Sequence, residues 1–290
     1  MSDKVNCFLI GAQKSGSTAL ARYMEQIDKV CVSSPKATNY FNHSFYKSFQ
    51  IKSYSEYKNT FKNKKAKYFC DASDCYHADS ESLAKIKKYN ENAKVIFIIR
   101  ELSSMIVSLH EHLVWAGYQK EHDLNRAWSN GERASGKYKE YLDYKGITSI
   151  GNQAQVAYDL FGDNLLILSS SELREQPLKV INRICKFLDV EELDKIEKVV
   201  VNERVRRKSK IISLINNIIP STIKTRIKIS LNSKGIEIDG IVRKINMSKK
   251  TEKEGKIEKK IVIDKNIQLH IDKQNKIISN VMSKYESSTS

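Results

Sequence analysis

The chain has 290 residues, of which 40% are hydrophobic, and it carries a net charge of +16 at pH 7. That length suits one large domain, and no run approaches the roughly 20 apolar residues that a membrane-spanning helix needs. The first apolar run is too short for a secretion signal, so we expect a cytosolic protein.

Apolar runs and helical patterns alternate along the first two thirds of the chain. Strands are predicted at residues 5–10, 30–33, 67–71, 94–100 and 165–168. Helices are predicted at residues 18–27, 80–89, 102–115, 151–161 and 178–188, with Ser17 or Thr18 capping the first. Strands that alternate with crossover helices form parallel sheets. The sequence therefore predicts an α/β fold of three layers, a central parallel β-sheet flanked by helices.

The remainder of the chain is basic and rich in isoleucine. Residues 201–265 hold 18 Lys and Arg against 7 Asp and Glu, and a last helix is predicted at residues 265–285. We expect one domain over residues 1–290, with a mainly helical C-terminal region at about 210–290. Its basic segment either guides an anionic acceptor, contacts an anionic membrane through helices broken at Pro220, or packs on the domain. No nucleic acid is expected, because aromatic residues do not interleave the charges.

Five cysteines at irregular spacing include no Cys-x-x-Cys pair. Neither a disulfide framework nor structural zinc is predicted. Cys7, Cys31 and Cys70 lie in or beside apolar runs, where a buried thiol is the simpler interpretation.

Residues 11–18, GAQKSGST, form a glycine loop between the first strand and the first helix. Backbone N–H groups and the helix dipole at such a place attract an anion. Gly11 and Gly16 keep the spacing of a nucleotide-binding P-loop, but Lys14 precedes the second glycine. This places the cation beside the first phosphate, and no metal-holding Asp is apparent. The pattern therefore argues against a kinase that uses ATP and magnesium.

The loop resembles the donor loop of sulfotransferases that use 3′-phosphoadenosine-5′-phosphosulfate (PAPS), in which K-x-G-T-T stands where KSGST stands here. KVIFIIRELSSMIVS resembles the second signature of that family, a strand that ends in Arg with a Ser eight residues later. SSPKATNYF, CDASDCY and VNERVRRKSKII resemble further segments of its bacterial, carbohydrate-type (heparan-sulfate-sulfotransferase-like) members. The resemblance covers nearly the whole chain.

The resemblance implies a PAPS-dependent sulfotransferase with a P-loop-containing fold, no metal, and 3′-phosphoadenosine-5′-phosphate (PAP) as product. Lys14 would stabilise the bridging oxygen as the bond breaks. The 5′-phosphate would be held by Lys14, Ser15, Gly16, Ser17 and Thr18, and the 3′-phosphate by Arg100, Ser108, Lys208 and Ser209. The acceptor would be a hydroxyl of a glycan, a glycolipid or a small natural product. Aromatic residues such as Trp115, Tyr118 and Trp128 are candidates for its contacts.

One residue departs from the family pattern. Where relatives commonly carry the Glu that takes the acceptor proton, this chain has Ala37, which cannot act as a base. Three hypotheses stay open: an inactivated variant that Ala37→Glu would restore, another base, or a chain that binds the nucleotide without catalysis.

The candidates for another base are Asp71, His110 and His112; His43 has no motif support. Asp71 could instead cap a turn. His110 and His112 are two residues apart and point to different helix faces, so at most one faces the site.

Overall fold

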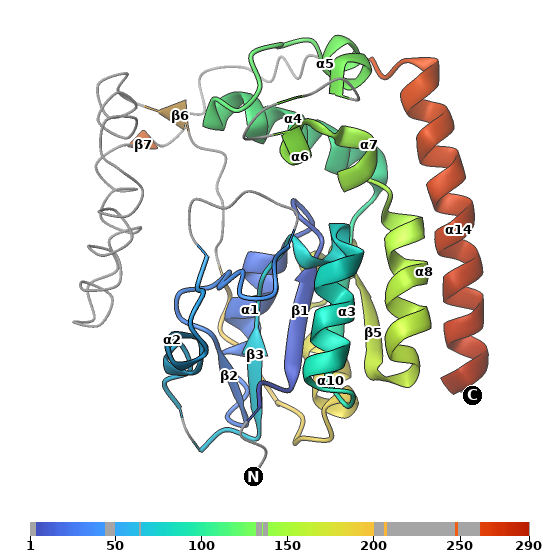
Figure 1. The fold of residues 1–290 in the computed structure, drawn as a ribbon. Coiled ribbons are helices and arrows are strands. Elements are labelled where there is room, and N and C mark those ends of the chain that lie inside the picture. Colours follow the sequence, from blue (N-terminus) through green and yellow to red (C-terminus); the bar gives the residue numbers. More distant parts are fainter. Residues whose placement is uncertain are drawn as a thin grey trace. The chain divides into compact units, whose positions relative to one another are not determined.

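The computed structural model describes residues 4–43, 50–63, 65–131, 135, 139–199, 206–207, 247–248 and 262–289. The chain divides into two compact units, Met1–Val199 with Ile261–Ser290, and Val200–Lys260. The described residues of the second unit form a short antiparallel pair, β6 (Arg206–Arg207) and β7 (Met247–Ser248). All other described elements belong to the first unit (Figure 1).

The first unit is built on a sheet of five parallel strands in the order β2-β3-β1-β4-β5. This confirms the predicted parallel α/β architecture. The strands are β1 (Cys7–Gly11), β2 (Val30–Val32), β3 (Tyr68–Asp71), β4 (Lys94–Ile99) and β5 (Leu165–Ser169). Because all five run the same way, the loops that follow them emerge at one edge, which we call the carboxyl edge.

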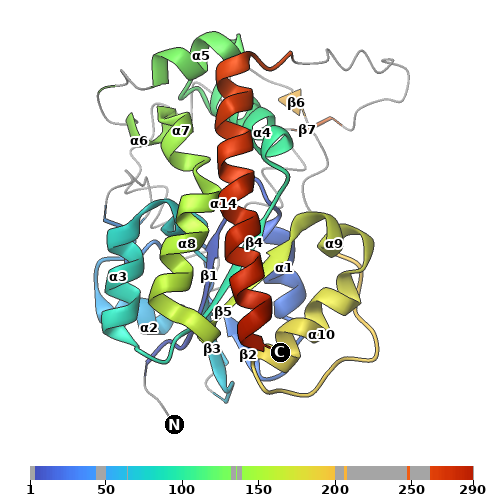
Figure 2. The ribbon, with the colours of Figure 1, turned by 90° about the vertical axis from the view of Figure 1, so that its right-hand side faces the viewer.

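Helices cover both faces of the sheet. Figure 2 shows α3 (Ser80–Tyr89) and α8 (Ile150–Phe161) on one side and α1 (Ser17–Met24), α9 (Ser170–Glu175) and α10 (Pro177–Phe187) on the other. The last helix, α14 (Lys265–Thr289), packs along α8, where a Cβ on Gly151 would come within 2.5 Å of the Gln274 carbonyl oxygen. The remaining helices are α2 (Tyr54–Asn59), α4 (Leu102–Ala116), α5 (Leu124–Gly131), α6 (Lys139–Leu142), α7 (Tyr144–Ile147) and the short η1 (Tyr76–Ala78) and η2 (Gly162–Asn164).

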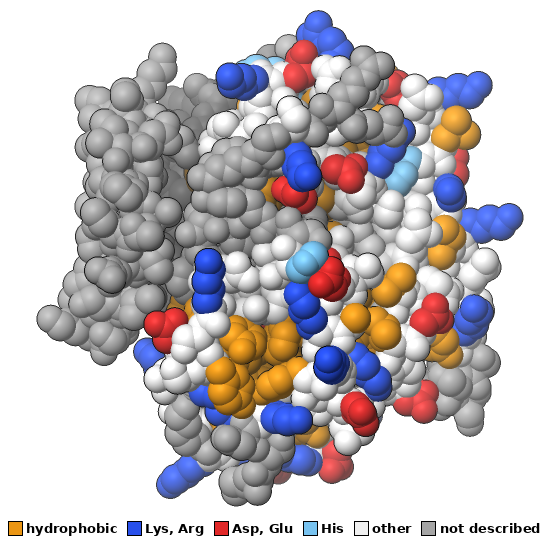
Figure 3. Space-filling view, in the orientation of Figure 1, with side chains coloured by type: hydrophobic (Ala, Val, Ile, Leu, Met, Phe, Trp, Pro, Cys, Tyr) orange, Lys and Arg blue, Asp and Glu red, His pale blue; other side chains and the backbone are white. Residues whose placement is uncertain are grey.

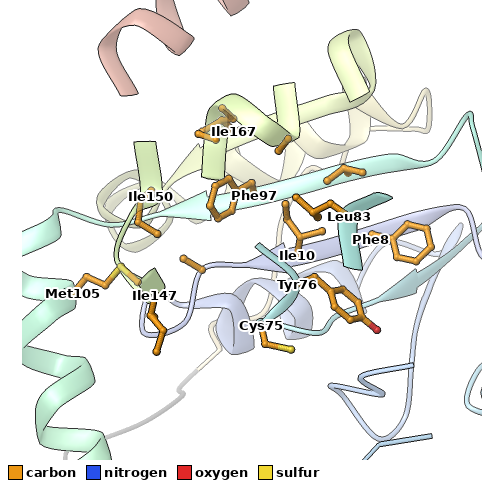
Figure 4. Packing of buried hydrophobic residues seen from close by; sticks show 14 of the residues in the cluster. Phe8, Ile10, Cys75, Tyr76, Leu83, Phe97, Met105, Ile147, Ile150 and Ile167 are labelled. Atoms are coloured by element: carbon orange, nitrogen blue, oxygen red, sulfur yellow. The ribbon is translucent and has the colours of Figure 1, made fainter. Parts of the chain in front are cut away.

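Alternation along the strands sends side chains into two separate cores. Phe8, Ile10 and Phe97 point to the face covered by α3 and α8, where they meet Leu83 and Ile150 (Figure 4). The intervening residues point to the other face and pack against α1, α9 and α10. A sheet buried on both faces explains why its strands appear in the sequence as continuous apolar runs.

Two sequence-based expectations need comment. The first helix begins at Ser17, with Gly16 as its N-cap and no capping side chain, so the predicted cap by Ser17 or Thr18 was wrong. The pair of helices predicted around Pro220, like nearly all of the basic segment, lies outside the described residues. The five cysteines are buried free thiols, and burial was expected for Cys7, Cys31 and Cys70.

The surface of the described part shows mixed charges. In Figure 3, Lys and Arg side chains alternate with Asp and Glu, and hydrophobic side chains gather beside α2, whose Tyr54 is 42% exposed. No helix among the described residues is long and apolar enough to cross a membrane.

Candidate active site

The glycine loop leaves the carboxyl edge of β1 and turns into α1. Gly16 has φ +95°, a conformation that side chains rarely adopt, and it directly precedes the N–H groups at the start of α1. Gly11 has φ +149°, and a Cβ there would lie 2.2 Å from Cδ2 of His77. Both glycines are therefore required by the shape of the loop.

His77 anchors the loop to the body of the protein. Its Nε2 accepts a hydrogen bond from the Gln13 N–H (3.3 Å), so the ring proton lies on Nδ1 and is donated to Oε1 of Gln153 (2.7 Å). The Gln153 amide in turn donates to the carbonyl oxygens of Gly146 and Ile147. This chain of bonds fixes the backbone just before Lys14.

Two buried polar atoms of the glycine loop have no hydrogen-bond partner among the described residues. They are Nε2 of Gln13 and Oγ of Ser15, whose residues are 8% and 0% exposed. Since buried donors are nearly always satisfied, a loop that holds two of them is suited to an anionic ligand that accepts their hydrogen bonds.

Arg100 joins the end of β4 to the glycine loop. Its Nη1 donates to the Lys14 carbonyl oxygen (3.1 Å). The next residue, Glu101, caps α4 by accepting hydrogen bonds from the N–H groups of Ser103 and Ser104, so the helix starts immediately beyond the arginine. The two motifs that stand 86 residues apart in sequence thus meet at the carboxyl edge.

Helix α4 carries two site candidates along one face. Ser108 and His112 are spaced four residues apart and therefore lie one above the other. Ser108 is half-buried and His112 is exposed. The opposite face buries Met105, Leu109 and other apolar residues against the core.

Charges meet around Lys14. Burial lowers the pKa of the Lys14 ammonium, and the carboxylate of Asp74 opposes that shift. The positive charge of Arg100 lowers the pKa further, and the carboxylate of Glu111 raises it. The charges of Asp74, Arg100 and Glu111 therefore all act on the Lys14 ammonium.

The two histidines of α4 have different surroundings. Desolvation, together with the positive charge of Lys14, lowers the pKa of His112 to about 4 while Asp74 opposes the shift, so its imidazole is neutral at pH 7. His110 is buried, its Nδ1 lies 2.8 Å from the Tyr144 hydroxyl, and its Nε2 lies 3.0 Å from the His122 carbonyl oxygen. Only His112 of this pair faces Lys14, as the helical spacing required.

Asp71, at the end of β3, is fully buried among hydroxyl groups. Its Oδ2 accepts hydrogen bonds from Thr38 (2.9 Å), Tyr57 (3.1 Å) and Tyr76 (3.0 Å), and its Oδ1 accepts one from Ser73 (2.7 Å). Burial raises the pKa of Asp71, and these four hydrogen bonds oppose the shift. The carboxylate ties the loops after β2 and β3 to each other.

The sequence matches the family model for the sulfotransferase domain over residues 4–213, well over half of the chain. The chain belongs to the sulfotransferase family. Among solved structures it resembles a sulfotransferase from Alicyclobacillus acidocaldarius, with a TM-score of 0.61 and 19% identity over 69% of this chain and 87% of that one. This likeness supports the fold.

Two more distant structures are also sulfotransferases. A domain from the curacin biosynthetic pathway has a TM-score of 0.45 and 16% identity, covering 66% of this chain and 75% of that one. Mouse sulfotransferase SULT7A1 complexed with PAP has a TM-score of 0.41 and 14% identity, covering 67% of this chain and 61% of that one. A search of curated proteins gave no match.

In this sulfotransferase, Ala37 lies in the loop after β2, with φ +62°. Its N–H donates to the Ala72 carbonyl oxygen in the loop after β3 (3.0 Å), and its own carbonyl oxygen accepts from the Asn39 side chain (3.0 Å). Its side chain is a methyl group, which cannot accept a proton, so Ala37 cannot act as the base.

The site of the sulfotransferase also contains residues to which the sequence analysis gave no role. The ammonium of Lys36 lies 3.5 Å from Oγ of Ser17 and 3.9 Å from Oδ2 of Asp74. Lys36 and Asp74 belong to the segments SSPKATNYF and CDASDCY, which resemble family segments. Parallel strands bring the loops that follow them to one edge of the sheet, so the sequence could have indicated that these two residues approach the glycine loop. Which loops are close to each other, however, depends on the strand order.

Lys208 and Ser209, predicted to bind the 3′-phosphate, lie outside the described residues. Within the part of the sulfotransferase that is described, no three His, Cys, Asp or Glu side chains form a group that could hold a metal ion.

Proposed function

We propose that this sulfotransferase transfers the sulfuryl group of PAPS to a hydroxyl of a carbohydrate or glycolipid. The observation that carries the proposal is the hydrogen bond between Arg100 and the Lys14 carbonyl oxygen, because it joins the two expected phosphate-binding motifs. One nucleotide with phosphates at both ends of its ribose suits such a pair.

The residues of the glycine loop fit the 5′-phosphosulfate. Ser15 has a buried hydroxyl without a partner among the described residues, and Ser17 begins α1, where N–H groups face outward. Gly16 and Thr18 complete the cradle. Arg100 and Ser108 would hold the 3′-phosphate, since a guanidinium donates two parallel hydrogen bonds to phosphate. Lys208 and Ser209 remain part of this proposal.

The reaction forms a bond from the acceptor oxygen to sulfur and breaks the bond from sulfur to the bridging oxygen, whose electron pair stays on the 5′-phosphate of PAP. Lys14 donates a hydrogen bond to that bridging oxygen and stabilises its growing negative charge. The half-buried position of Lys14 strengthens this interaction, because water screens it less than at the surface.

Among the candidate bases, we propose that His112 takes the proton from the acceptor hydroxyl. Its imidazole is neutral at pH 7, the charge of Lys14 acts on it, and its side chain is exposed at the surface. Asp71 is assigned a structural role instead, because its oxygens are buried and engaged by four hydroxyls.

An aromatic surface next to His112 supports a sugar acceptor. The Trp115 side chain is 45% exposed, and its ring lies nearly parallel to that of His112, with centroids 5.9 Å apart and an interplanar angle of 25°. The ring offers an apolar face on which the face of a sugar ring can rest. Incubating the protein with radiolabelled PAPS and a panel of glycosides, glycolipids and hydroxylated natural products tests the acceptor class; transfer to the natural products alone would contradict it.

Replacing Arg100 with alanine is expected to weaken PAP binding by about 30- to 100-fold, because a bidentate, charge-assisted contact to the 3′-phosphate is lost. Isothermal titration calorimetry with PAP measures this. The loss should be smaller for adenosine 5′-phosphate, which lacks the 3′-phosphate.

Arg174→Ala is the matched control, since Arg174 is an exposed arginine in the last turn of α9. The control should bind PAP as the wild type does. Equal PAP affinity in the Arg100→Ala protein and the wild type would refute the assignment of the 3′-phosphate site.

Replacing His112 with glutamine is expected to lower turnover by about 10²-fold, near the low end for a general base, while PAP affinity stays unchanged. In the wild type, kcat/KM should stay level from pH 8 to about pH 5 and fall as His112 is protonated near its pKa of about 4. The pH dependence of kcat/KM, measured with the best acceptor of the panel, checks both.

His122→Gln removes an imidazole for which the sequence gave no catalytic role and serves as the control. Turnover in the His112→Gln protein within twofold of the wild type would rule out His112 as the proton acceptor.

A further inference from the structure

A second lysine reaches the glycine loop from the loop after β2, a strand that β3 separates from β1 in the sheet. Lys36 follows β2, and its ammonium lies 3.5 Å from Oγ of Ser17, the first residue of α1. The side chain is 24% exposed. An ammonium in this position is within reach of any anion that the start of α1 binds.

A carboxylate lies on the other side of the same ammonium. Oδ2 of Asp74 is 3.9 Å from Nζ of Lys36, and the Asp74 side chain is 34% exposed. The backbone of Asp74 packs on the end of β1, since its carbonyl oxygen lies 3.2 Å from where a Cβ on Gly11 would be. Asp74 is therefore held beside the glycine loop.

The loops that carry Lys36 and Asp74 are tied to each other. The Ala37 N–H donates to the Ala72 carbonyl oxygen (3.0 Å), and the Asn39 N–H donates to Oγ of Ser73 (3.0 Å). These bonds lie just after Lys36 and just before Asp74 in sequence, so they hold the backbones of the two residues near each other.

The charge of Asp74 also reaches the other lysine of the loop. It raises the pKa of Lys14 against the effect of burial. The charge of Asp74 thus acts on two cations, Lys14 and Lys36, beside the loop whose unsatisfied buried donors suit a bound anion.

We propose that Lys36 is a second cation of the phosphosulfate site and that Asp74 holds it beside Ser17 until the anion of PAPS takes the carboxylate's place. This rests on the proposed use of PAPS. An oxyanion of the phosphosulfate accepts a hydrogen bond from Lys36, and the ion pair of Lys36 with Asp74 is exchanged for a contact with the ligand. Asp74 then competes with the nucleotide for the same ammonium.

The competition predicts opposite effects for the two side chains. Lys36→Gln is expected to weaken PAP binding by about tenfold, because one charge-assisted contact to the 5′-phosphate is lost. Asp74→Asn is expected to tighten PAP binding by about three- to tenfold, because a competing negative charge is removed. In the double variant, the gain from Asp74→Asn should shrink, since the cation for which it competes is absent.

Isothermal titration calorimetry with PAP on the full chain measures all three variants against the wild type. Lys52→Gln is the matched control, because Lys52 lies in the same connection between β2 and β3 and is exposed. It removes the same charge and should leave PAP affinity unchanged. Lys36→Arg should recover most of the affinity lost in Lys36→Gln, because it restores a positive charge. The melting temperatures of both variants should equal that of the wild type, whereas a purely structural role of Lys36 would lower the melting temperature of Lys36→Gln.

Lys36→Gln affinity within twofold of the wild type, or weaker binding in a folded Asp74→Asn protein, would overturn the proposal. The proposed function fails in a different way, because then the wild type itself would not bind PAP.

Discussion

Replacing Lys14 with alanine is expected to lower the conversion of PAPS to PAP by about 10³-fold, a larger kinetic effect than that predicted for His112→Gln. Lys14 is the cation of the glycine loop, it is half-buried, and its carbonyl oxygen is held by Arg100. The loss should fall mainly on turnover, because the charge that Lys14 stabilises grows as the bond from sulfur to oxygen breaks. Single-turnover measurements with radiolabelled PAPS, with and without an acceptor, give the rate.

The control is Lys29→Ala, which removes an exposed lysine just before β2. PAP binding by the Lys14→Ala protein should remain measurable, because Ser15, Ser17 and Arg100 keep their places. A variant that turns over PAPS at more than a tenth of the wild-type rate would show that the bridging oxygen is stabilised by another group.

Replacing Asp71 with alanine is expected to lower the free energy of unfolding by about 4 kcal/mol, since four buried hydroxyl donors lose their acceptor and each unsatisfied group is unfavourable by about 1–3 kcal/mol without full additivity. Urea unfolding followed by circular dichroism measures the change. The melting temperature should fall by roughly 10 °C for a domain of this size.

Asp163→Ala, an exposed aspartate before β5, should change stability little and serves as the control. Asp71→Asn keeps one acceptor oxygen and should lie between the wild type and Asp71→Ala. If the Asp71→Asn protein is as stable as the wild type yet loses more than 10²-fold in turnover, Asp71 acts on the acceptor proton after all.

Much of the fold followed from local patterns in the chain. The apolar runs at 94–100 and 165–168 are strands β4 and β5, because residues buried on both faces of a parallel sheet need no polar alternation. The helix predicted at 102–115 is α4, where Glu101 caps the first turn and Gly117 ends the last. The start of α1 was not predicted correctly, because Gly16 occupies the N-cap position where a capping side chain was expected.

The candidate site was predicted in part. Gly11, Lys14 and Gly16 could be recognised because the loop needs its glycines at fixed spacing, and Arg100 because it ends an unmistakable strand. Helical geometry also separated His110 from His112. Which of the two faces Lys14 could not be predicted, since that depends on the side of α4 that packs against the core.

Spacing along the chain was enough to specify a parallel sheet, an anion-binding turn after its first strand and an arginine after a later one, because these depend on neighbours within a few residues. The surroundings of residues in the loops depend on the strand order β2-β3-β1-β4-β5, which spacing along the chain does not determine. In this order Asp71 is buried among hydroxyl groups, and Lys36 and Asp74 lie beside the glycine loop. Contacts between loops of different strands depend on which strands are adjacent, and adjacency is fixed by the packing of the whole sheet.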